Sequence, residues 1–243
     1  MAGQLVEKTC VVTGATGLIG KEICRSLLAN GATVIAIYNS NPDPLDDLEQ
    51  NRLYKIKTDL VNQEAIEIAL KELSGITKTI DVLVACAGKT IRRVAMVSSN
   101  TDYDSIMDLN FKSLFQLVRS VLRPMYRSNS GRIILIGSVA GSRGLAGQSL
   151  YAASKGAINS FAQSLAQEVG EKQITVNVVA PGAVNNSSEA TYSKEEQAAV
   201  LSNIALRRLA EPCEIANVVS FLASDNASYV SGAIIPVDGC SRF

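Results

Sequence analysis

The chain has 243 residues, of which 47% are hydrophobic, so it is long enough for one domain with a substantial core and too apolar for a disordered chain. Lys plus Arg and Asp plus Glu both total 23, and this balance gives no reason to expect nucleic acid or an anionic membrane as a partner. Histidine is absent, which excludes Ser-His-Asp and Cys-His catalysis and histidine-bound metals.

Short β-rich apolar runs alternate with longer segments of helical period along the chain. The predicted strands are residues 8–13, 32–38, 53–58, 80–85, 132–137, 174–179 and 233–237. The predicted helices are residues 18–29, 62–73, 105–125, 152–169 and 211–223. The strands are continuous Val and Ile runs, which is typical of parallel sheets buried on both faces. We therefore predict one α/β domain, residues 1–243, with a doubly wound (Rossmann) parallel seven-stranded sheet and helices on both faces.

Two connecting segments are candidates for functional loops. The Gly- and Ser-rich segment 137–147 is predicted to be an active-site loop, because regular elements resume at once on both sides of it. The polar segment 185–201 resembles loops that close over a substrate.

The ends of the chain and its cysteines carry little functional information. Residues 1–8 contain no basic segment followed by an apolar run, and no apolar stretch is long enough to span a bilayer, so we expect a cytoplasmic protein. The five cysteines lie far apart without a C-x-x-C pair, which argues against a disulfide framework and a structural zinc site.

A glycine-rich turn follows the first predicted strand. It contains Gly14, Gly17 and Gly20, and a predicted helix begins within it. Glycines there permit a tight turn and close backbone approach to a pyrophosphate, which the free N–H groups of the helix N-terminus bind. An ordinary turn is the alternative, but the order strand, glycines and helix favours a dinucleotide site.

The end of the second strand indicates which dinucleotide is bound. An acidic residue there holds the ribose 2′-hydroxyl of NAD and repels the 2′-phosphate of NADP. In this chain Asn39 and Ser40 follow the strand, and the first carboxylate is Asp43. The pattern favours NADP(H), with Lys21 as a candidate phosphate contact or, alternatively, a solvated helix residue.

Three residues downstream have the chemistry for carbonyl reduction. Ser138 follows the fifth strand, and Tyr151 and Lys155 lie four residues apart on one face of a predicted helix. A free tyrosine has a pKa of about 10, which a neighbouring ammonium lowers. We therefore expect Lys155 to lower the pKa of Tyr151 and to bond the nicotinamide ribose, while Ser138 orients the substrate oxygen. A solvated surface pair is the alternative for Tyr151 and Lys155.

Over residues 8–239 the chain resembles the short-chain dehydrogenase/reductases, and in particular the bacterial 3-oxoacyl-[acyl-carrier-protein] reductases. The most specific stretches are residues 131–141, 151–155 and 174–182. The resemblance implies a catalytic tetrad of Asn110, Ser138, Tyr151 and Lys155. In the family the Asn holds a water that links the lysine to solvent, whereas a helix-capping or kink-stabilising amide is the alternative reading of Asn110.

The resemblance also implies NADPH as the cofactor, with NADH as the alternative. Asp59 and Leu60 match positions that contact the adenine, and residues 181–186 match the loop that meets the nicotinamide carboxamide. The expected cofactor contacts are Gly14, Thr16, Gly17, Leu18, Ile19, Gly20, Asn39, Ser40, Asp59, Leu60, Cys86, Ala87, Gly88, Tyr151, Lys155, Pro181, Gly182, Val184 and Asn186.

Partners are implied in the same way. Arg132 and Lys172 match positions that dock the acidic acyl carrier protein, and two ordinary surface cations are the alternative. Residues 237–239 match a strand used in a tetramer interface, so a homotetramer is expected. No metal, nucleic acid or membrane is expected to bind.

The sequence departs from the family pattern at cofactor positions. The family's middle glycine stands at the position of Leu18, and Gly17 occupies the place of an Arg that many NADP-dependent members carry. Cys86 replaces an Asn, and Asn186 replaces a Thr near the nicotinamide. None of these changes touches the tetrad, so we interpret the chain as a specialised relative that acts on a polyketide-like or polyene acyl chain.

Three functions follow from this pattern. The leading one is NADPH-dependent reduction of a 3-oxoacyl thioester on acyl carrier protein, in fatty-acid or polyketide/polyene-type synthesis. The second is an NAD(P)-dependent dehydrogenase of a free alcohol or ketone, which turnover of a free alcohol would support. The third is a catalytically weak dinucleotide-binding partner subunit, which would gain support if Tyr151→Phe left the biological activity unchanged.

Overall fold

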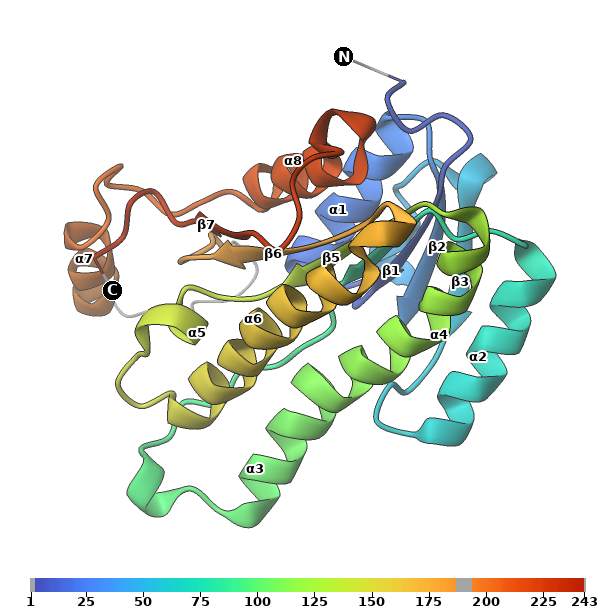
Figure 1. The fold of residues 1–243 in the computed structure, drawn as a ribbon. Helices are drawn as coiled ribbons and strands as arrows, with labels where there is room; N and C mark the ends of the chain where they lie inside the picture. The colour runs from blue at the N-terminus through green and yellow to red at the C-terminus, as the bar shows by residue number, and fades with distance from the viewer. Residues whose placement is uncertain (1–2, 187–193, 243) are drawn as a thin grey trace.

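The computed structural model describes residues 3–186 and 194–242, which form one parallel sheet with helices on both faces (Figure 1). The strands are β1 (Thr9–Thr13), β2 (Thr33–Tyr38), β3 (Leu53–Lys57), β4 (Val82–Ala85), β5 (Gly131–Ile136), β6 (Ile174–Pro181) and β7 (Ile234–Val237). Their order is β3-β2-β1-β4-β5-β6-β7, and every neighbouring pair is parallel. The predicted doubly wound seven-stranded fold is confirmed.

The two faces of the sheet carry separate hydrophobic clusters. In the described part of the chain the helices are α1 (Leu18–Ala29), α2 (Gln63–Ile76), α3 (Asn100–Met107), α4 (Ser113–Ser128), α5 (Ala140–Arg143), α6 (Ser149–Val169), α7 (Lys194–Ser202) and α8 (Pro212–Ala223). Helices α1 and α8 pack on one face, and α2, α4 and α6 cover the other (Figure 1). In β1, Val11 faces the second group while Cys10 and Val12 face the first. Burial on both faces explains the continuous apolar runs.

The predicted helix 105–125 differs from the structure. Helix α3 begins at Asn100 and is joined to α4 by a π-helical turn, Asp108–Lys112. A π turn inserts one extra residue into a helix and is frequent at functional sites. The extra residue breaks the regular helical period, so periodicity alone gave no sign of it.

Two segments predicted as loops contain helices. Segment 137–147 includes α5, which has only four residues, and segment 185–201 includes most of α7. Residues 187–193 of the predicted substrate loop lie outside the described residues. Short helices rich in small or polar residues lack the apolar stripe that identifies a helix in a sequence.

The sheet topology determines where a ligand site forms. Strands β1 and β4 are neighbours although β2 and β3 lie between them in the chain. The connections from these two strands leave in opposite directions, which opens a crevice at their carboxyl ends. Residues 3–186 and 194–242 contain no helix that is long and apolar enough to cross a membrane. In the same described ranges no group of three or more Cys, Asp or Glu side chains is arranged to bind a metal ion.

Candidate active site

A cavity of about 970 Å³ opens at the carboxyl edge of the sheet. Its walls come mainly from the segments that follow β1, β4, β5 and β6, and Ala199, Val200 and Ile204 add an apolar wall. The predicted cofactor residues that line it are Gly14, Gly17, Leu18, Ile19, Gly20, Cys86, Ala87, Gly88, Tyr151, Lys155, Pro181, Gly182 and Val184. The volume lies at the upper end of the usual range for ligand cavities.

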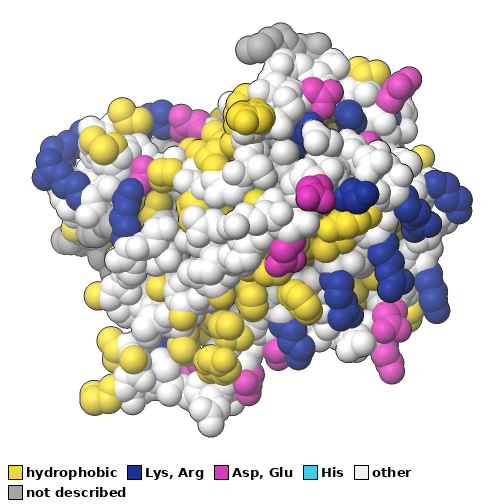
Figure 2. Space-filling model, viewed as in Figure 1, with side chains coloured by type: hydrophobic (Ala, Val, Ile, Leu, Met, Phe, Trp, Pro, Cys, Tyr) yellow, Lys and Arg dark blue, Asp and Glu magenta, His cyan; other side chains and the backbone are white. Residues whose placement is uncertain are grey.

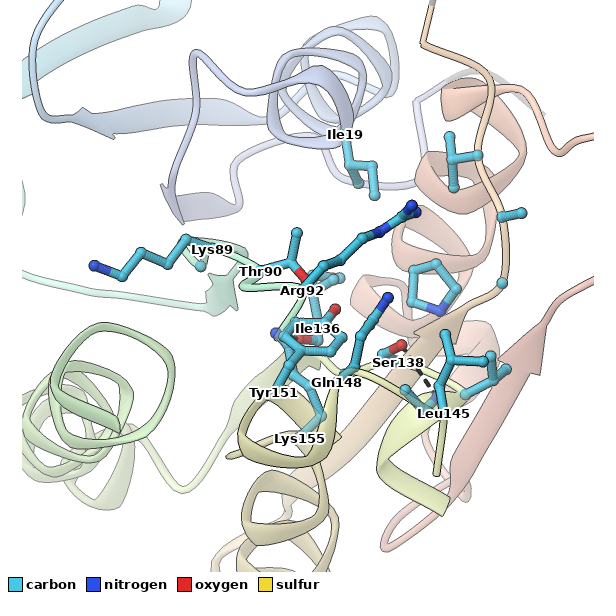
Figure 3. Close-up of a pocket in the computed structure, with 18 of the residues that line it drawn as sticks. Ile19, Lys89, Thr90, Arg92, Ile136, Ser138, Leu145, Gln148, Tyr151 and Lys155 are labelled. Carbon is cyan, nitrogen blue, oxygen red and sulfur yellow. Dashed lines mark hydrogen bonds between the residues drawn. The ribbon is translucent and has the colours of Figure 1, made fainter. Parts of the chain in front are cut away.

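Three of the four tetrad residues meet in this cavity. Ser138 follows β5, Tyr151 lies in the first turn of α6, and Lys155 lies one turn later (Figure 3). Tyr151 and Ser138 share a side-chain hydrogen bond, and the Nζ atom of Lys155 lies 5.8 Å from the centroid of the Tyr151 ring. The fold therefore gathers a phenol, a hydroxyl and an amine that are far apart in the chain.

Lys155 is buried at the floor of the cavity. Its Nζ atom donates a hydrogen bond of 2.8 Å to the backbone carbonyl of Ile136, the last residue of β5. Burial disfavours the charged amine and lowers the pKa of Lys155 to about 8, and the neighbouring Cys86 opposes this effect. The lysine is thus held in place and is able to gain or lose a proton near neutral pH.

The pKa of Tyr151 is raised in the structure, whereas the sequence predicts that it is lowered. Burial disfavours the phenolate and raises the pKa of Tyr151, and the hydrogen bond from Ser138 only partly offsets this. The expected lowering by Lys155 is wrong for this structure, because the Lys155 amine bonds a backbone carbonyl instead of the phenol. The tyrosine is therefore held as the protonated acid at neutral pH.

Asn110 lies in the π turn and is fully buried. Its Oδ1 atom accepts a hydrogen bond of 2.9 Å from the N–H of Lys89, and its Nδ2 atom donates one of 3.0 Å to the carbonyl of the same residue. Nδ2 also donates to Ser154 Oγ at 3.0 Å, and Ser154 donates to the carbonyl of Tyr151 at 2.8 Å. The amide therefore links the segment after β4 to the first turn of α6.

Gly88 separates Asn110 from Lys155. A Cβ atom built on Gly88 would lie 3.2 Å from Asn110 Oδ1 and 3.4 Å from Lys155 Nζ. Asn110 Oδ1 and Lys155 Nζ therefore both approach Gly88 closely, on the side where a side chain would begin. Asn110 does not line the cavity itself.

The glycine-rich turn packs closely against neighbouring backbone because its glycines have no side chains. Gly14 has a φ of +63°, and a Cβ there would lie 2.8 Å from the Cα of Ala87. A Cβ on Gly20 would lie 2.1 Å from the carbonyl oxygen of Gly14. Gly17 caps α1 with no side-chain hydrogen bond and no acidic residue follows in the first turn, so the first N–H groups of the helix face the cavity. This arrangement fits a phosphate group.

The segment after β4 joins the cofactor end to the catalytic end. The N–H groups of Cys86 and Ala87 both donate to Thr13 Oγ1 at 3.2 Å, which fixes this segment against the end of β1. Burial raises the pKa of the Cys86 thiol to about 11, and Lys155 partly opposes the shift. Cys86 therefore stays a neutral thiol at the site where the family has an amide.

On the nicotinamide side, the end of β6 lies against the chain after β7. A Cβ on Gly182 would lie 2.7 Å from the Cβ of Asp238, so only glycine permits this contact. Pro181, Gly182 and Val184 line the cavity, whereas Asn186 does not.

The predicted adenine end lies outside the cavity. Asn39 and Ser40 are exposed at the end of β2, and Asp59 is exposed while its carboxylate accepts a hydrogen bond from Val61 N–H. Leu60 is buried in the core under α2, and Thr16 is not among the lining residues. The adenine contacts predicted for Asp59 and Leu60, and the other cofactor contacts predicted for Thr16, Asn39 and Ser40, thus stay predictions.

Lys21, the candidate phosphate contact, is engaged elsewhere. Its Nζ atom lies 3.0 Å from the carboxylate of Asp47, which also bonds Arg25 at 3.1 Å. These two cations together lower the pKa of Asp47.

Arg132 and Lys172 lie at the opposite edge of the sheet from the cavity. Arg132 is the second residue of β5, and its guanidinium contacts Asp225 at 3.2 Å and the carbonyl of Gln173 at 3.4 Å. The Arg132 side chain is only 11% exposed. Arg132 therefore stabilises the amino edge of the sheet, and a carrier protein bound there would not face the cavity of the same chain.

Sequence reasoning missed several residues that shape the site. Gln148, directly before α6, is buried and points into the cavity beside Ser138 and Tyr151 (Figure 3). Gly141 allows α5 to lie on α6, since a Cβ there would be 2.7 Å from the carbonyl carbon of Lys155. Arg92 also lines the cavity. The position of Arg92 just after β4, at the carboxyl edge of a parallel sheet, was the available signal.

Known proteins resemble this chain over nearly its whole length. A family model described as enoyl-(acyl carrier protein) reductase matches residues 14–240. The 3-oxoacyl-[acyl-carrier-protein] reductase FabG of Vibrio cholerae is 37% identical over 97% of this chain and 98% of that protein. Nodulation protein G of a Rhizobium species is 34% identical over 97% of each chain. The crystal structure of a 3-oxoacyl-[acyl-carrier protein] reductase from Brucella melitensis covers all of this chain (100%) and 94% of its own, with a TM-score of 0.92 and 26% identity.

Proposed function

This chain belongs to the short-chain dehydrogenase/reductase family and is an NAD(P)(H)-dependent oxidoreductase, and we propose that it reduces a 3-oxoacyl thioester on acyl carrier protein to the 3-hydroxyacyl thioester. The observation that carries this proposal is Tyr151, a phenol kept protonated by burial and hydrogen-bonded to Ser138 inside the cavity. A protonated acid beside a second hydroxyl is the arrangement that carbonyl reduction needs. The reductases from Vibrio cholerae and Brucella melitensis act on this class of substrate by name.

The residues present fit a dinucleotide. The uncapped N-terminus of α1 offers N–H groups to the diphosphate, and Gly14 and Gly20 leave no side chain between the turn and its neighbours. Lys155 and the segment 181–184 would hold the nicotinamide end. When bound, the reduced nicotinamide supplies a hydride to the carbonyl carbon.

The protein side of the reaction is proton delivery. Tyr151 donates its phenolic proton to the substrate oxygen, and Ser138 hydrogen-bonds the same oxygen and orients the carbonyl. We propose that Lys155 returns a proton to Tyr151 and that one water beside Gly88 joins Lys155 to Asn110. Support comes from the approach of Asn110 Oδ1 and Lys155 Nζ to the same side of Gly88, and from a pKa of about 8 for Lys155.

We propose NADPH as the preferred cofactor. Asn39 and Ser40 at the end of β2 carry no charge to repel a 2′-phosphate, and they are exposed enough to bind one. Asp47 is paired with two cations of α1, Lys21 and Arg25, which compensate its charge.

The far wall of the cavity suits an acyl chain. Val94, Leu145, Val200 and Ile204 line it, and apolar side chains of this kind bind hydrocarbon by burying it from water. The large cavity is compatible with the polyketide-like or polyene substrate that the departures from the family pattern suggest.

Carrier docking at Arg132 and Lys172 requires assembly. Because both residues lie at the edge opposite the cavity, a carrier bound there could deliver substrate only to another copy of the chain. The face formed by α4 and α6 gathers hydrophobic side chains (Figure 2), and Phe115 and Tyr126 on α4 are 41% and 39% exposed. Such a face favours a homo-oligomer, in keeping with the expected homotetramer.

The test is turnover with three substrates. Acetoacetyl thioester on acyl carrier protein, a free alcohol, and a 2-enoyl thioester on the carrier are offered separately while the reduced or oxidised nicotinamide is followed. Rapid NADPH consumption with the 3-oxo substrate alone supports the proposal. Turnover of the free alcohol alone favours a dehydrogenase, and turnover of the enoyl thioester alone favours the reaction that the family model's description names.

A further inference from the structure

The cavity carries an excess of positive charge. Among the described residues that line it are four basic side chains, Lys89, Arg92, Arg93 and Lys155, and no Asp or Glu. A low-dielectric cleft lined by one sign of charge concentrates ligands of the opposite sign. The dinucleotide is such a ligand, because its diphosphate is anionic in both NADPH and NADH.

Lys89 points away from the glycine-rich turn, and Arg93 and Lys155 bond groups outside it. The Lys89 amine donates to Ser105 Oγ on α3, and Figure 3 shows this side chain directed out of the cavity. The Arg93 guanidinium bonds the carboxylate of Asp102 at 2.5 Å. Lys155 bonds the end of β5 deep in the site.

Arg92 has the opposite orientation. Figure 3 shows its side chain extending from the segment after β4 across the cavity in the direction of Ile19, in the first turn of α1. Both residues line the same cavity. The guanidinium therefore faces the helix N-terminus from the other side of the crevice.

The backbone on both sides of Arg92 is fixed. Asn110 bonds the N–H and the carbonyl of Lys89 at 2.9 and 3.0 Å. The N–H of Arg93 donates to the carbonyl of Gly147 at 2.7 Å. Arg92 thus extends from a segment that is anchored at both ends, which reduces the entropy lost when its side chain binds a ligand.

We propose that Arg92 binds the diphosphate of the nicotinamide dinucleotide and closes over it opposite the glycine-rich turn. The planar guanidinium offers two parallel N–H donors to phosphate oxygens. It supplies a cation across the crevice from the glycine-rich turn, in which residues 14–20 carry no charged side chain. The inference rests on the proposed function only in that the chain binds a nicotinamide dinucleotide.

The position of Arg92 distinguishes binding of the diphosphate from binding of the 2′-phosphate. The 2′-phosphate is expected beside Asn39 and Ser40 at the end of β2, and neither residue lines the cavity that Arg92 crosses. A diphosphate contact therefore contributes equally to NADPH and NADH, whereas a 2′-phosphate contact would contribute to NADPH alone.

The experiment measures dinucleotide binding without a carbonyl substrate. Dissociation constants of NADPH and NADH are determined by calorimetry for the unaltered protein, Arg92→Gln, Arg92→Lys and the matched control Arg127→Gln, which removes the same charge from an exposed residue of α4 that does not line the cavity. Thermal melting of each variant confirms that it is folded. We expect Arg92→Gln to weaken both dinucleotides about tenfold, as for loss of a charge-assisted hydrogen bond. Arg92→Lys should weaken both less, and Arg127→Gln should stay within about twofold.

Three other outcomes would overturn the role of Arg92 or the proposed function on which it rests. A loss confined to NADPH would overturn the proposal and assign Arg92 to the 2′-phosphate. Unchanged dissociation constants with a raised KM for the carrier-bound substrate would overturn it and assign Arg92 to the substrate. If the unaltered protein bound neither dinucleotide, the proposed function itself would fail, which this design distinguishes from a failure at Arg92 alone.

Discussion

The proposed catalytic end and the proposed nucleotide end of the crevice are built differently. At the catalytic end Lys155 and Asn110 are buried and held by protein hydrogen bonds of 2.8 to 3.0 Å. At the nucleotide end Asn39 and Ser40 are exposed, and the side chain of Ser40 has no part in the cavity walls. The same sheet edge thus supports a fixed set of reacting groups and a more open set of binding groups.

This difference indicates which properties are easy to alter. Groups that are buried in a shared hydrogen-bond network respond strongly to substitution, because each change leaves other polar atoms unpaired. Exposed groups at the end of a strand change a binding preference without disturbing their neighbours. We therefore expect large, coupled effects at the catalytic end and small, separable effects at the nucleotide end.

The largest effect is expected for Tyr151→Phe. Removing the phenol removes the proton donor, and kcat should fall roughly 10³-fold, while the dissociation constant for NADPH should change less than about threefold. Steady-state kinetics and calorimetry measure the two quantities. Tyr126→Phe on α4 is the matched control and should keep full activity. If Tyr151→Phe kept its activity, the phenol would not be the proton donor, and the catalytic end would be no more sensitive to substitution than the nucleotide end.

Asn110→Leu tests the coupling within the catalytic end. The substitution leaves the N–H and carbonyl of Lys89 without their partner, so the free energy of unfolding should fall by about 1–3 kcal/mol. kcat should fall roughly 10-fold or more because the segment after β4 is released. Urea unfolding and kinetics of the same preparation provide both values. A normal stability with normal kcat would mean that the network has no functional role.

The pH dependence of the reduction tests Lys155 as the proton source. The pKa of Lys155 is lowered to about 8 by burial, so its charged form is present below pH 8 and is lost above it. kcat should therefore be constant near neutral pH and decline by about tenfold per unit well above pH 8. NADPH saturation at each pH separates catalysis from binding. A rate that rises through this range would contradict the assignment.

The smallest effect, confined to the nucleotide end, is expected for Ser40→Asp. A carboxylate at the end of β2 repels the 2′-phosphate, so the dissociation constant for NADPH should rise about tenfold while that for NADH stays within about twofold. kcat at saturating cofactor should not change. Ser40→Asn is the neutral control of the same size. Equal weakening of both dinucleotides would show that residue 40 lies away from the 2′-position.

The sequence was most informative where function depends on local spacing. Tyr151 and Lys155 share a helix face, and the glycines after β1 form one turn, so their placement in the cavity follows from a few consecutive residues. It was less informative where partners are far apart in the chain. The ion pair of Arg132 with Asp225 joins residues that are 93 positions apart in the chain. The pKa of Tyr151 is raised because its side chain is buried in the folded chain. The orientation of Arg92 depends likewise on anchors at Asn110 and Gly147.

Gly88 limits how this enzyme can vary by mutation. A methyl group at this residue would lie 3.2 Å from Asn110 Oδ1 and 3.4 Å from Lys155 Nζ, so the Asn110 amide would have to shift to admit it. In the proposed relay, this shift would slow the return of a proton to Tyr151 between turnovers, a defect that single-turnover assays would overlook. The absence of a side chain at residue 88 is therefore a condition for rapid repeated turnover in the proposed mechanism.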